Sequence, residues 1–262
     1  MTTTSVIPAD LVPGIDTEAR KVVALRQTRL LLAAPIAIAL VATLITATMS
    51  GPADPKGQPA TGAATIGLYV GMLAVFVVSA LLGIASTGGE YRHKTMALTV
   101  LFAPDRDRLV TAKYVAVAAY AFALALAAEL VSLGVLLIAA RGKFELGWRL
   151  FEVLGAGLLV AMCWAVLGAG IGLLLRTFSG AVWLLLGWAF VLEPLMWVVA
   201  KGFGAGWMAA LLPVSATVAG VSAGSFDEAE VFAPTPAALV ILLLWTAAVG
   251  AAGWWDLRNR DL

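Results

Sequence analysis

The sequence has 262 residues, of which 61% are hydrophobic and 13% are charged, and its net charge at pH 7 is +1. Soluble domains are about 25% charged, so this composition is typical of a polytopic membrane protein and leaves no segment able to build a separate soluble core. A net charge near zero argues against nucleic acid as a partner. The single cysteine, Cys163, excludes an internal disulfide framework and a multi-cysteine metal site.

Six apolar runs are long enough to cross a bilayer as helices, which takes about 20 residues each. In chain order they are Leu30–Met49, Thr65–Ser86, Tyr114–Ala140, Leu150–Leu175, Ala181–Ala200 and Ala237–Trp255. The first run is longer than the apolar part of a signal peptide and follows a long polar or mixed segment, so we expect an uncleaved span. The predicted fold class is an all-α membrane protein with one transmembrane domain, residues 1–262.

The segment before the first span, residues 1–29, contains basic residues interleaved with apolar ones. Val22, Leu25 and Leu30 lie among the basic residues of Thr17–Leu30. This pattern predicts an amphipathic helix that lies on the cytoplasmic face of the membrane, with Thr17 as a weak cap. The alternative is that Thr17–Leu30 is the solvated start of the first transmembrane helix.

Charge is concentrated between the second and third runs. The segment Thr87–Lys113 holds eight charged residues and His93, the only histidine of the chain. Gly88 and Gly89 are expected to break the second span so that the chain turns, and Lys113 is expected to anchor the third span at the membrane interface.

A short helix is predicted over Glu90–Phe102, inside this charged loop, and Pro104 is expected to end it. Tyr91, Leu98 and Phe102 lie at helical spacing on one face, which makes the helix amphipathic. Such a helix under the membrane presents a charged tip to the cytoplasm. The alternative is that the loop only anchors the chain to lipid headgroups.

The connection between the fifth and sixth runs, residues 201–236, is long and contains the apolar patch Trp207–Val221 followed by the acidic segment Phe226–Glu230. The patch is too short to span a bilayer and is interrupted by Pro213. We therefore expect a re-entrant or interface-lying pair of short helices on the outer side, with their backbone polar groups buried in protein.

The distribution of basic residues predicts the orientation. If the N-terminus is cytoplasmic, twelve of the 17 Lys and Arg residues fall in inner segments, including those of 87–113. Because inner segments carry an excess of Lys and Arg, both termini and the charged loop are predicted to be cytoplasmic.

Carboxylates within the apolar runs are candidates for function. Glu129 and Glu193 lie in the outer halves of their spans, and no Lys or Arg is predicted inside a span to pair with them. Pro194 is expected to kink the helix next to Glu193 and to free a carbonyl group. One interpretation places Glu129, Glu193 and Pro194 on a transport path; the other is that the glutamates form buried helix–helix hydrogen bonds.

Two GxxxG spacings, Gly67/Gly71 and Gly168/Gly172, allow close approach of helices. We expect them to serve packing within the chain rather than a dimer seam.

Several of these segments together resemble one family of transporters. They are "GEYRHKT" (Gly89–Thr95), "LFAPDRDRLVTAK" (Leu101–Lys113), "LLPVSA" (Leu211–Ala216) and "RNRDL" (Arg258–Leu262). In composition, order and spacing they are similar to segments of ABC-2 type permeases, the membrane subunits of bacterial ABC exporters with the type V, G-subfamily-like fold. The six spans, the N-terminal amphipathic helix and the re-entrant segment fit the same family.

The resemblance implies a role for the charged loop. In that family the loop between spans two and three is a coupling helix that docks in a cleft of a separate ATPase subunit. The residues to which it assigns this role are Glu90, Tyr91, Arg92, His93, Lys94 and Thr95. Charges at its tip fit this role because they set the register and orientation of a protein contact.

The family also implies partners and a location. The chain lacks a GxxxxGK[ST] phosphate loop, so ATP and magnesium are expected on partner ATPase subunits, and this chain is expected to hold no cofactor and to catalyse no reaction. A second copy of the chain, or a similar permease, is expected to complete the export path in the bacterial cell membrane. The expected cargo is hydrophobic or amphipathic, such as a drug, a lipid or a peptide.

Two other functions remain open. One is a proton-coupled secondary transporter that uses Glu129 and Glu193 and needs no ATPase. The other is a membrane scaffold that recruits a cytoplasmic protein through the charged loop without transporting anything. Only the exporter predicts ATP hydrolysis that responds to cargo.

Overall fold

The computed structural model describes most of the chain, and every regular element in the described part is a helix. The described residues are 14–18, 20, 26–52, 59–93, 95, 105–222, 225 and 231–259, and for 26–29 only the backbone is described. Six of the described helical segments are long and apolar enough to cross a membrane. The predicted all-helical membrane fold with six spans is therefore confirmed.

The spans lie close to their predicted positions and most are longer than predicted. They are α2 (Arg26–Met49), α3 (Ile66–Arg92), α5 (Arg106–Ala139), α6 (Trp148–Leu175), the pair α7 (Phe178–Gly187) and α8 (Glu193–Gly202), and α11 (Thr235–Asn259). A π-helical turn, Trp188–Leu192, joins α7 to α8 into one apolar segment. The short helices α9 (Gly206–Ala209) and α10 (Pro213–Ser222) lie between spans five and six.

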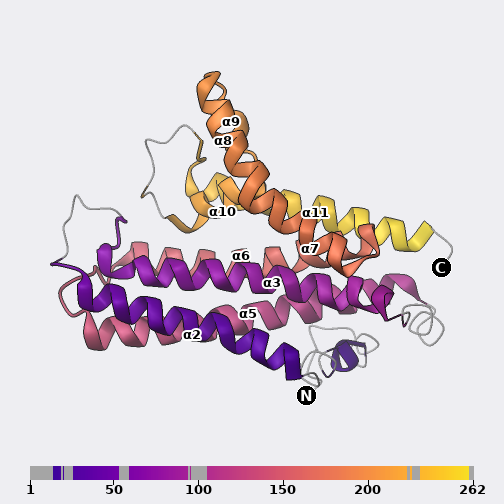
Figure 1. Cartoon of the computed structure of the whole chain (residues 1–262), viewed down its shortest axis with the longest axis horizontal. Coiled ribbons are helices and arrows are strands. Elements are labelled where there is room, and N and C mark those ends of the chain that lie inside the picture. The colour runs from indigo at the N-terminus through magenta and orange to yellow at the C-terminus, as the bar shows by residue number, and fades with distance from the viewer. Residues whose placement is uncertain are drawn as a thin grey trace, which may run out of the picture.

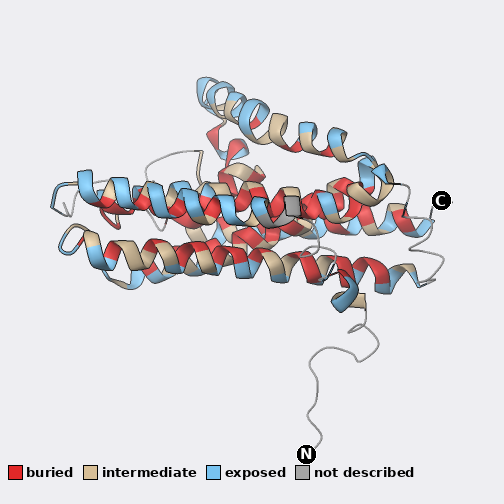
Figure 2. Ribbon diagram, turned by 60° about the horizontal axis from the view of Figure 1, so that its bottom comes forward, coloured by how far each residue is buried: buried red, intermediate tan, exposed pale blue. Residues whose placement is uncertain are grey.

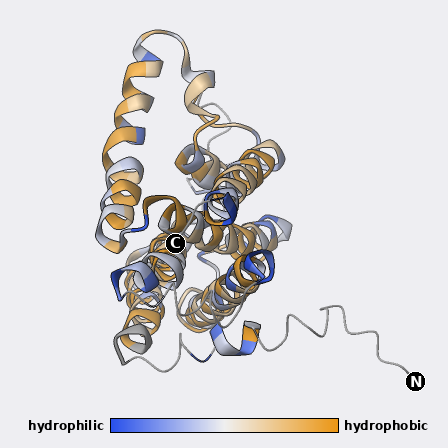
Figure 3. Cartoon of the chain, turned by 90° about the vertical axis from the view of Figure 1, so that its right-hand side faces the viewer, coloured by the Kyte–Doolittle hydropathy of each residue, from blue (hydrophilic) through white to orange (hydrophobic). Residues whose placement is uncertain are grey.

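The centre of the bundle is the pair α3 and α6, while α2 and α5 pack beside it and α11 packs along α6 (Figure 1). In the most apolar windows of α3 and α6, 61% of the residues are buried, compared with 11% for the α7–α8 segment. Figure 2 shows the same contrast, with buried residues concentrated in the bundle and exposed ones along the projecting helix. Hydrophobic residues cover outer as well as inner faces of the helices (Figure 3), as expected for helices surrounded by lipid.

Small residues bring α3 and α6 together. A Cβ atom at Gly83 would collide with the backbone of Ala165, and one at Gly168 would collide with the backbone of Ala80. The other glycines of the two GxxxG spacings also face neighbouring helices of the same chain, since Gly67 and Gly71 lie against α2 and Gly172 lies against Thr87. The prediction that these glycines serve internal packing is confirmed.

The predicted helix break at Gly88 and Gly89 is wrong, because α3 continues through both residues and ends at Arg92. The missing side chain at Gly88 serves a close approach instead, since a Cβ there would lie 3.3 Å from the Cα atom of Phe178 at the start of α7. Residues Glu90 to Arg92 are therefore the last turn of the second span and do not begin a new helix.

Two turns at the same end of the bundle have clear local causes. Asp105 caps α5, because its Oδ1 accepts hydrogen bonds from the backbone N–H groups of Asp107 (3.1 Å) and Arg108 (3.2 Å). Arg176 ends α6 in the left-handed conformation, with φ at 53°. Only Arg176 and Thr177 separate α6 from α7, so span five starts beside the end of span four.

The α7–α8 segment moves progressively away from the bundle from its first residue to its last. Its α7 end packs against α3 and α6, while α8 and α9 project away from the other spans (Figure 1). Large apolar side chains on this segment are exposed, among them Trp183, Phe190, Val191 and Val198. In a membrane such a surface contacts lipid or another protein.

We predict that Gly168→Ala destabilises the protein by about 1–3 kcal/mol, because the added methyl group overpacks the crossing of α3 and α6. Gly155 is the matched control on the same helix, since no atom would lie within 4 Å of a Cβ there. Gly155→Ala is expected to be neutral or slightly stabilising. Thermal unfolding of the two detergent-solubilised variants checks this, and equal midpoints would contradict the close crossing.

Candidate functional site

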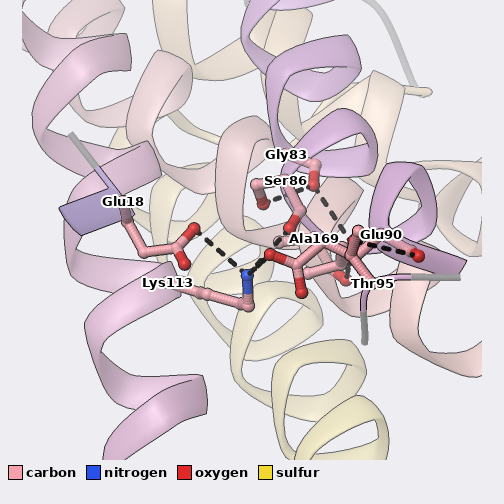
Figure 4. A network of polar contacts seen from close by, with 8 residues as sticks. Glu18, Gly83, Ser86, Glu90, Thr95, Lys113 and Ala169 are labelled. Atoms are coloured by element: carbon pink, nitrogen blue, oxygen red, sulfur yellow. Dashed lines mark hydrogen bonds and ion pairs between the residues drawn. The ribbon is translucent and has the colours of Figure 1, made fainter. Parts of the chain in front are cut away.

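Lys113 lies in the third turn of α5, and its side chain is completely buried. Its ammonium group contacts Oε1 of Glu90 at 2.8 Å, Oε2 of Glu18 at 3.1 Å and the backbone carbonyl of Ser86 at 3.0 Å (Figure 4). We call these four residues the Lys113 cluster. A lysine ammonium has three N–H donors, and here each donor has an acceptor.

The Lys113 cluster joins three separate parts of the chain. Glu18 comes from the helical turn 14–18, Ser86 and Glu90 come from the last two turns of α3, and Lys113 comes from α5. Both carboxylates are also shielded, with side-chain exposures of 7% for Glu18 and 11% for Glu90. Buried ion pairs of this kind fix a geometry more than they add stability, because the attraction has to offset the cost of removing each charge from water.

The burial of Lys113 corrects its predicted role as an anchor at the membrane interface. On α5, buried apolar residues lie three and four positions before Lys113 (Val110 and Leu109) and after it (Ala116 and Val117). Lys113 therefore stands on the face of α5 that packs into the protein. This spacing of apolar residues around Lys113 is visible in the sequence and indicates that the lysine faces the protein interior. A buried cation requires acidic partners, so the same signal indicates that carboxylates lie nearby.

The predicted coupling residues lie at and just after the end of α3, as far as they are described. Tyr91 is partly buried, and the guanidinium of Arg176 lies 5.9 Å from its ring centre. Arg92 and His93 are exposed, and the Arg92 guanidinium lies 5.9 Å from the ring centre of Phe178. Lys94 lies outside the described residues.

Thr95 closes the end of α3. Its backbone N–H donates to the carbonyl of Glu90 at 2.9 Å, and the N–H of His93 donates to the carbonyl of Gly89 at 3.0 Å. The bond from Thr95 has the spacing of a Schellman motif, which satisfies a carbonyl left over at a helix end. Most of the predicted helix Glu90–Phe102 lies outside the described residues, so its helical part beyond Arg92 stays a prediction.

A second polar contact set, which we call the α11 clasp, holds the end of the last span beside the start of α5. The Arg106 guanidinium donates to the carbonyl of Leu257 at 2.9 Å, and the indole N–H of Trp254 donates to Oδ1 of Asp107 at 2.8 Å. Arg176 pairs with Asp256 at 2.8 Å. The ends of α3, α5, α6 and α11 are thus fixed to one another at this end of the bundle.

The N-terminal segment is described only in part. Residues 14–18 are helical, so Thr17 lies inside a helical turn and does not cap one. Residues 21–25 and the side chains of 26–29 lie outside the description, and the predicted interfacial helix over Thr17–Leu30 is therefore untested along most of its length.

Glu193 is fully buried and has three hydrogen-bond donors around it. Its Oε1 accepts from the backbone N–H of Ser215 at 2.7 Å and from the Ser215 hydroxyl at 3.2 Å, and its Oε2 accepts from the indole N–H of Trp188 at 2.9 Å. Ser215 is the third residue of α10, so Glu193 satisfies one of the N–H groups that the first turn of a helix leaves without a partner. The geometry matches the interpretation as a buried helix–helix hydrogen bond.

Pro194 follows a π-helical turn. The N–H of Glu193 donates to the carbonyl of Trp188, five residues earlier, and this wider turn comes directly before the proline, which has no N–H to donate. The predicted distortion of the fifth span beside Glu193 takes this form.

Glu129 has different neighbours from Glu193. It lies on α5 with 5% of its surface exposed, against Gly157 of α6 and Met72 of α3. Its Oε1 has no hydrogen-bond partner among the described residues. The structure therefore gives the two glutamates separate surroundings: three donors bind the carboxyl group of Glu193, whereas Oε1 of Glu129 has none among the described residues.

In the part of the chain that the structure describes, no three His, Cys, Asp or Glu side chains come together as a group that could hold a metal ion. No protein-family model matches the chain, and no curated protein matches it either.

We predict that Lys113→Met destabilises the protein by about 3–5 kcal/mol, because it leaves the Glu18 and Glu90 carboxylates buried without their cation. Adding Glu18→Gln and Glu90→Gln to the same variant removes those charges and should restore most of the loss. Thermal unfolding in detergent measures both effects. Lys201→Met, at an exposed lysine of α8, is the control, and an equal loss in this control would argue against the Lys113 cluster.

We predict that Glu193→Gln loosens the start of α10. The amide keeps one acceptor oxygen, so either Trp188 or Ser215 loses its bond, which costs about 1–3 kcal/mol. Hydrogen exchange measured by mass spectrometry should become about tenfold faster in the peptide that contains Ser215. Glu152→Gln, at a half-buried glutamate of α6, should leave that peptide unchanged, and unchanged exchange in Glu193→Gln itself would refute the assignment.

Proposed function

We propose that this chain is the membrane-spanning permease subunit of an ATP-driven ABC exporter of the ABC-2 type. It forms, with a second copy or a similar permease, the path for a hydrophobic or amphipathic cargo such as a drug, a lipid or a peptide. Cytoplasmic ATPase subunits bind ATP and magnesium and drive the cycle. The location is the bacterial cell membrane, with both termini in the cytoplasm.

The observation that carries this proposal is the fixed base of the α3–α5 connection. A segment that receives mechanical work from a partner transmits it only if its ends are rigidly joined to the spans. Here Glu90, at the end of α3, is held by Lys113 of α5, and the start of α5 is capped by Asp105 and held to α11 by Arg106. Force on the loop would therefore move α3, α5 and α11 together.

Charges near this base suit a docking surface for another protein. Arg92 and His93 are exposed at the end of α3, and the Arg108 side chain is 57% exposed at the start of α5. Exposed charges at an interface contribute orientation and association rate more than affinity, which is the requirement for a contact that couples two subunits through a cycle. The coupling role of Glu90, Tyr91, Arg92, His93, Lys94 and Thr95 is part of this proposal.

The short helices after span five support a re-entrant segment on the outer side. Backbone groups within a membrane need partners inside the protein. The N–H of Ser215 at the start of α10 is bound by Glu193, and the Leu211 carbonyl just before α10 accepts from the indole of Trp245 at 2.8 Å. Most of α10 is buried, and it packs against α6 and α11.

The contacts of Glu193 reduce the set of residues that we propose for the transport path. Because all three donors around Glu193 are engaged with its carboxylate, we assign Glu193 and Pro194 to holding α8 and α10 in place. Glu129 remains the intramembrane carboxylate that is available for another task.

We predict that the native complex, purified through this chain in mild detergent, contains an ATPase whose hydrolysis responds to cargo. Arg92→Glu should lower the amount of co-purified ATPase by about tenfold or more, because reversing the charge replaces an attraction across the interface by a repulsion. Arg141→Glu is the control, since Arg141 is exposed on the loop after α5, at the other end of that helix. Quantitative mass spectrometry of the purified complexes measures the ratio.

The outcomes separate the three candidate functions. Absence of any ATPase, together with transport that collapses with the proton gradient, would favour the secondary transporter. A bound cytoplasmic protein without cargo-responsive hydrolysis would favour the scaffold. Equal ATPase recovery in Arg92→Glu and Arg141→Glu would reject the docking role of the end of α3.

A further inference from the structure

Glu129 occupies a narrow crevice between α2, α3 and α5 that is too small to hold a water molecule. The residues around it in the crevice are almost all apolar; among them are Ala39, Leu68, Met72, Phe76 and Ala128. We call this space the Glu129 crevice. It lies well inside the third span, ten residues before the end of α5, or about 15 Å at the helical rise of 1.5 Å per residue.

The protein leaves room for this carboxyl group. α6 passes Glu129 at Gly157, where a Cβ atom would collide with Oε1 of Glu129. The same Cβ would lie 2.9 Å from the terminal methyl of Met72. A side chain at position 157 would therefore displace the carboxyl group, and the glycine keeps Glu129 inside the bundle instead of turned towards lipid.

Among the described residues, no cation forms an ion pair with Glu129. Leu30–Met49 of α2 contains no titratable residue, and the nearest one along α3 is Tyr69, whose hydroxyl lies 3.2 Å from that of Thr61. On α6 the titratable groups are Arg149, eight residues before Gly157, Glu152, five residues before it, and Cys163, six residues after it.

On α5 itself the nearest cation is Lys113, sixteen residues away or about 24 Å along the helix, and it belongs to the Lys113 cluster. Tyr114 and Tyr120 lie between them along α5, and Arg141, exposed on the loop after α5, is twelve residues from Glu129. The polar neighbour in the crevice, Ser132, receives a hydrogen bond from Thr43 at 3.1 Å. A charged carboxylate at position 129 would thus stand in an apolar site without a counter-charge, which is far more costly than a neutral carboxylic acid.

We propose that Glu129 is a proton-binding site inside the membrane, holding its proton while the Glu129 crevice is closed and releasing it when helix movement admits water. The site takes a proton rather than a metal cation. Hard cations require about six or more oxygen ligands, whereas a proton needs one carboxylate oxygen. This proposal does not rest on the ATP-driven function, because a buried protonated carboxyl group can be detected in the isolated chain.

Glu193 provides the comparison that makes the proposal testable. Both glutamates are at least 95% buried, but the Glu193 carboxylate accepts three hydrogen bonds and Oε1 of Glu129 accepts none from the described residues. Hydrogen bonds donated to a carboxylate favour its charged form, whereas burial without donors favours the neutral form. One chain therefore contains a proposed proton-binding carboxyl group and a matched buried glutamate whose carboxyl group has three hydrogen-bond donors.

The experiment uses a membrane-soluble carbodiimide, which reacts with protonated carboxyl groups in apolar surroundings. The acid adds across one C=N bond: its proton goes to a nitrogen, and its oxygen bonds to the central carbon. The acyl group then moves from that oxygen to nitrogen and leaves a stable N-acylurea, so no oxidant and no leaving group is involved. The full chain, in lipid nanodiscs, is treated at several pH values and the modified peptides are quantified by mass spectrometry.

We expect the Glu129 peptide to be labelled about tenfold or more above the Glu193 peptide at neutral pH, with labelling that falls as the pH rises. Glu129→Gln should abolish the label at that position, and Glu193→Gln should leave the labelling of Glu129 in place. Equal labelling of the two peptides, or stronger labelling of Glu193, would overturn the proposal.

Infrared spectroscopy provides a second measurement in case the reagent does not reach the crevice. A protonated carboxyl group has a carbonyl stretching band separate from those of carboxylates and amides. Loss of this band in Glu129→Gln, with the band retained in Glu193→Gln, supports the proposal even if labelling is weak. A spectrum that is the same in Glu129→Gln and in the unsubstituted chain overturns it.

Discussion

The arrangement of one end of the molecule depends on where the ammonium group of Lys113 lies. A buried cation must have acceptors for its donors, and it finds them on α3 and on the N-terminal turn that contains Glu18. Any displacement of α3 along α5 would separate Lys113 from Glu90 and leave both charges in an apolar interior. The contact therefore fixes the register of span two against span three. It thereby fixes the position of the α3–α5 connection relative to both spans.

The coarse architecture follows from the sequence because lipid imposes simple rules. A span needs an unbroken apolar run of sufficient length, and six such runs are visible without any knowledge of packing. Finer features depend on which neighbour lies opposite a residue. Gly88 and Gly89 resemble a helix break in the sequence, yet Gly88 is needed for the close approach of Phe178, which belongs to a helix ninety residues later in the chain.

The charged residues likewise separate into what the sequence shows and what only the packing of the helices decides. Glu129 and Glu193 are both visible in the sequence as carboxylates within apolar runs, but only the structure distinguishes them. Glu193 is bound by the start of α10, a helix that sequence reasoning placed only approximately, whereas Glu129 faces the glycine of a central helix. The burial of Lys113 was predictable from its helical spacing among apolar residues. The identity of its two acidic partners was not, because one of them, Glu18, lies 95 residues away in the sequence.

The turn between α6 and α7 determines the direction in which the fifth span leaves the bundle. Arg176 adopts a backbone conformation that costs a non-glycine residue about 1–3 kcal/mol, and a glycine would relieve that strain. A glycine would also remove the guanidinium that binds Asp256 and lies against Tyr91. Backbone preference and side-chain contacts therefore oppose each other at Arg176, in the two-residue turn that connects the α7–α8 segment to α6. The direction in which that segment leaves the bundle thus depends on a strained turn that side-chain contacts hold in place.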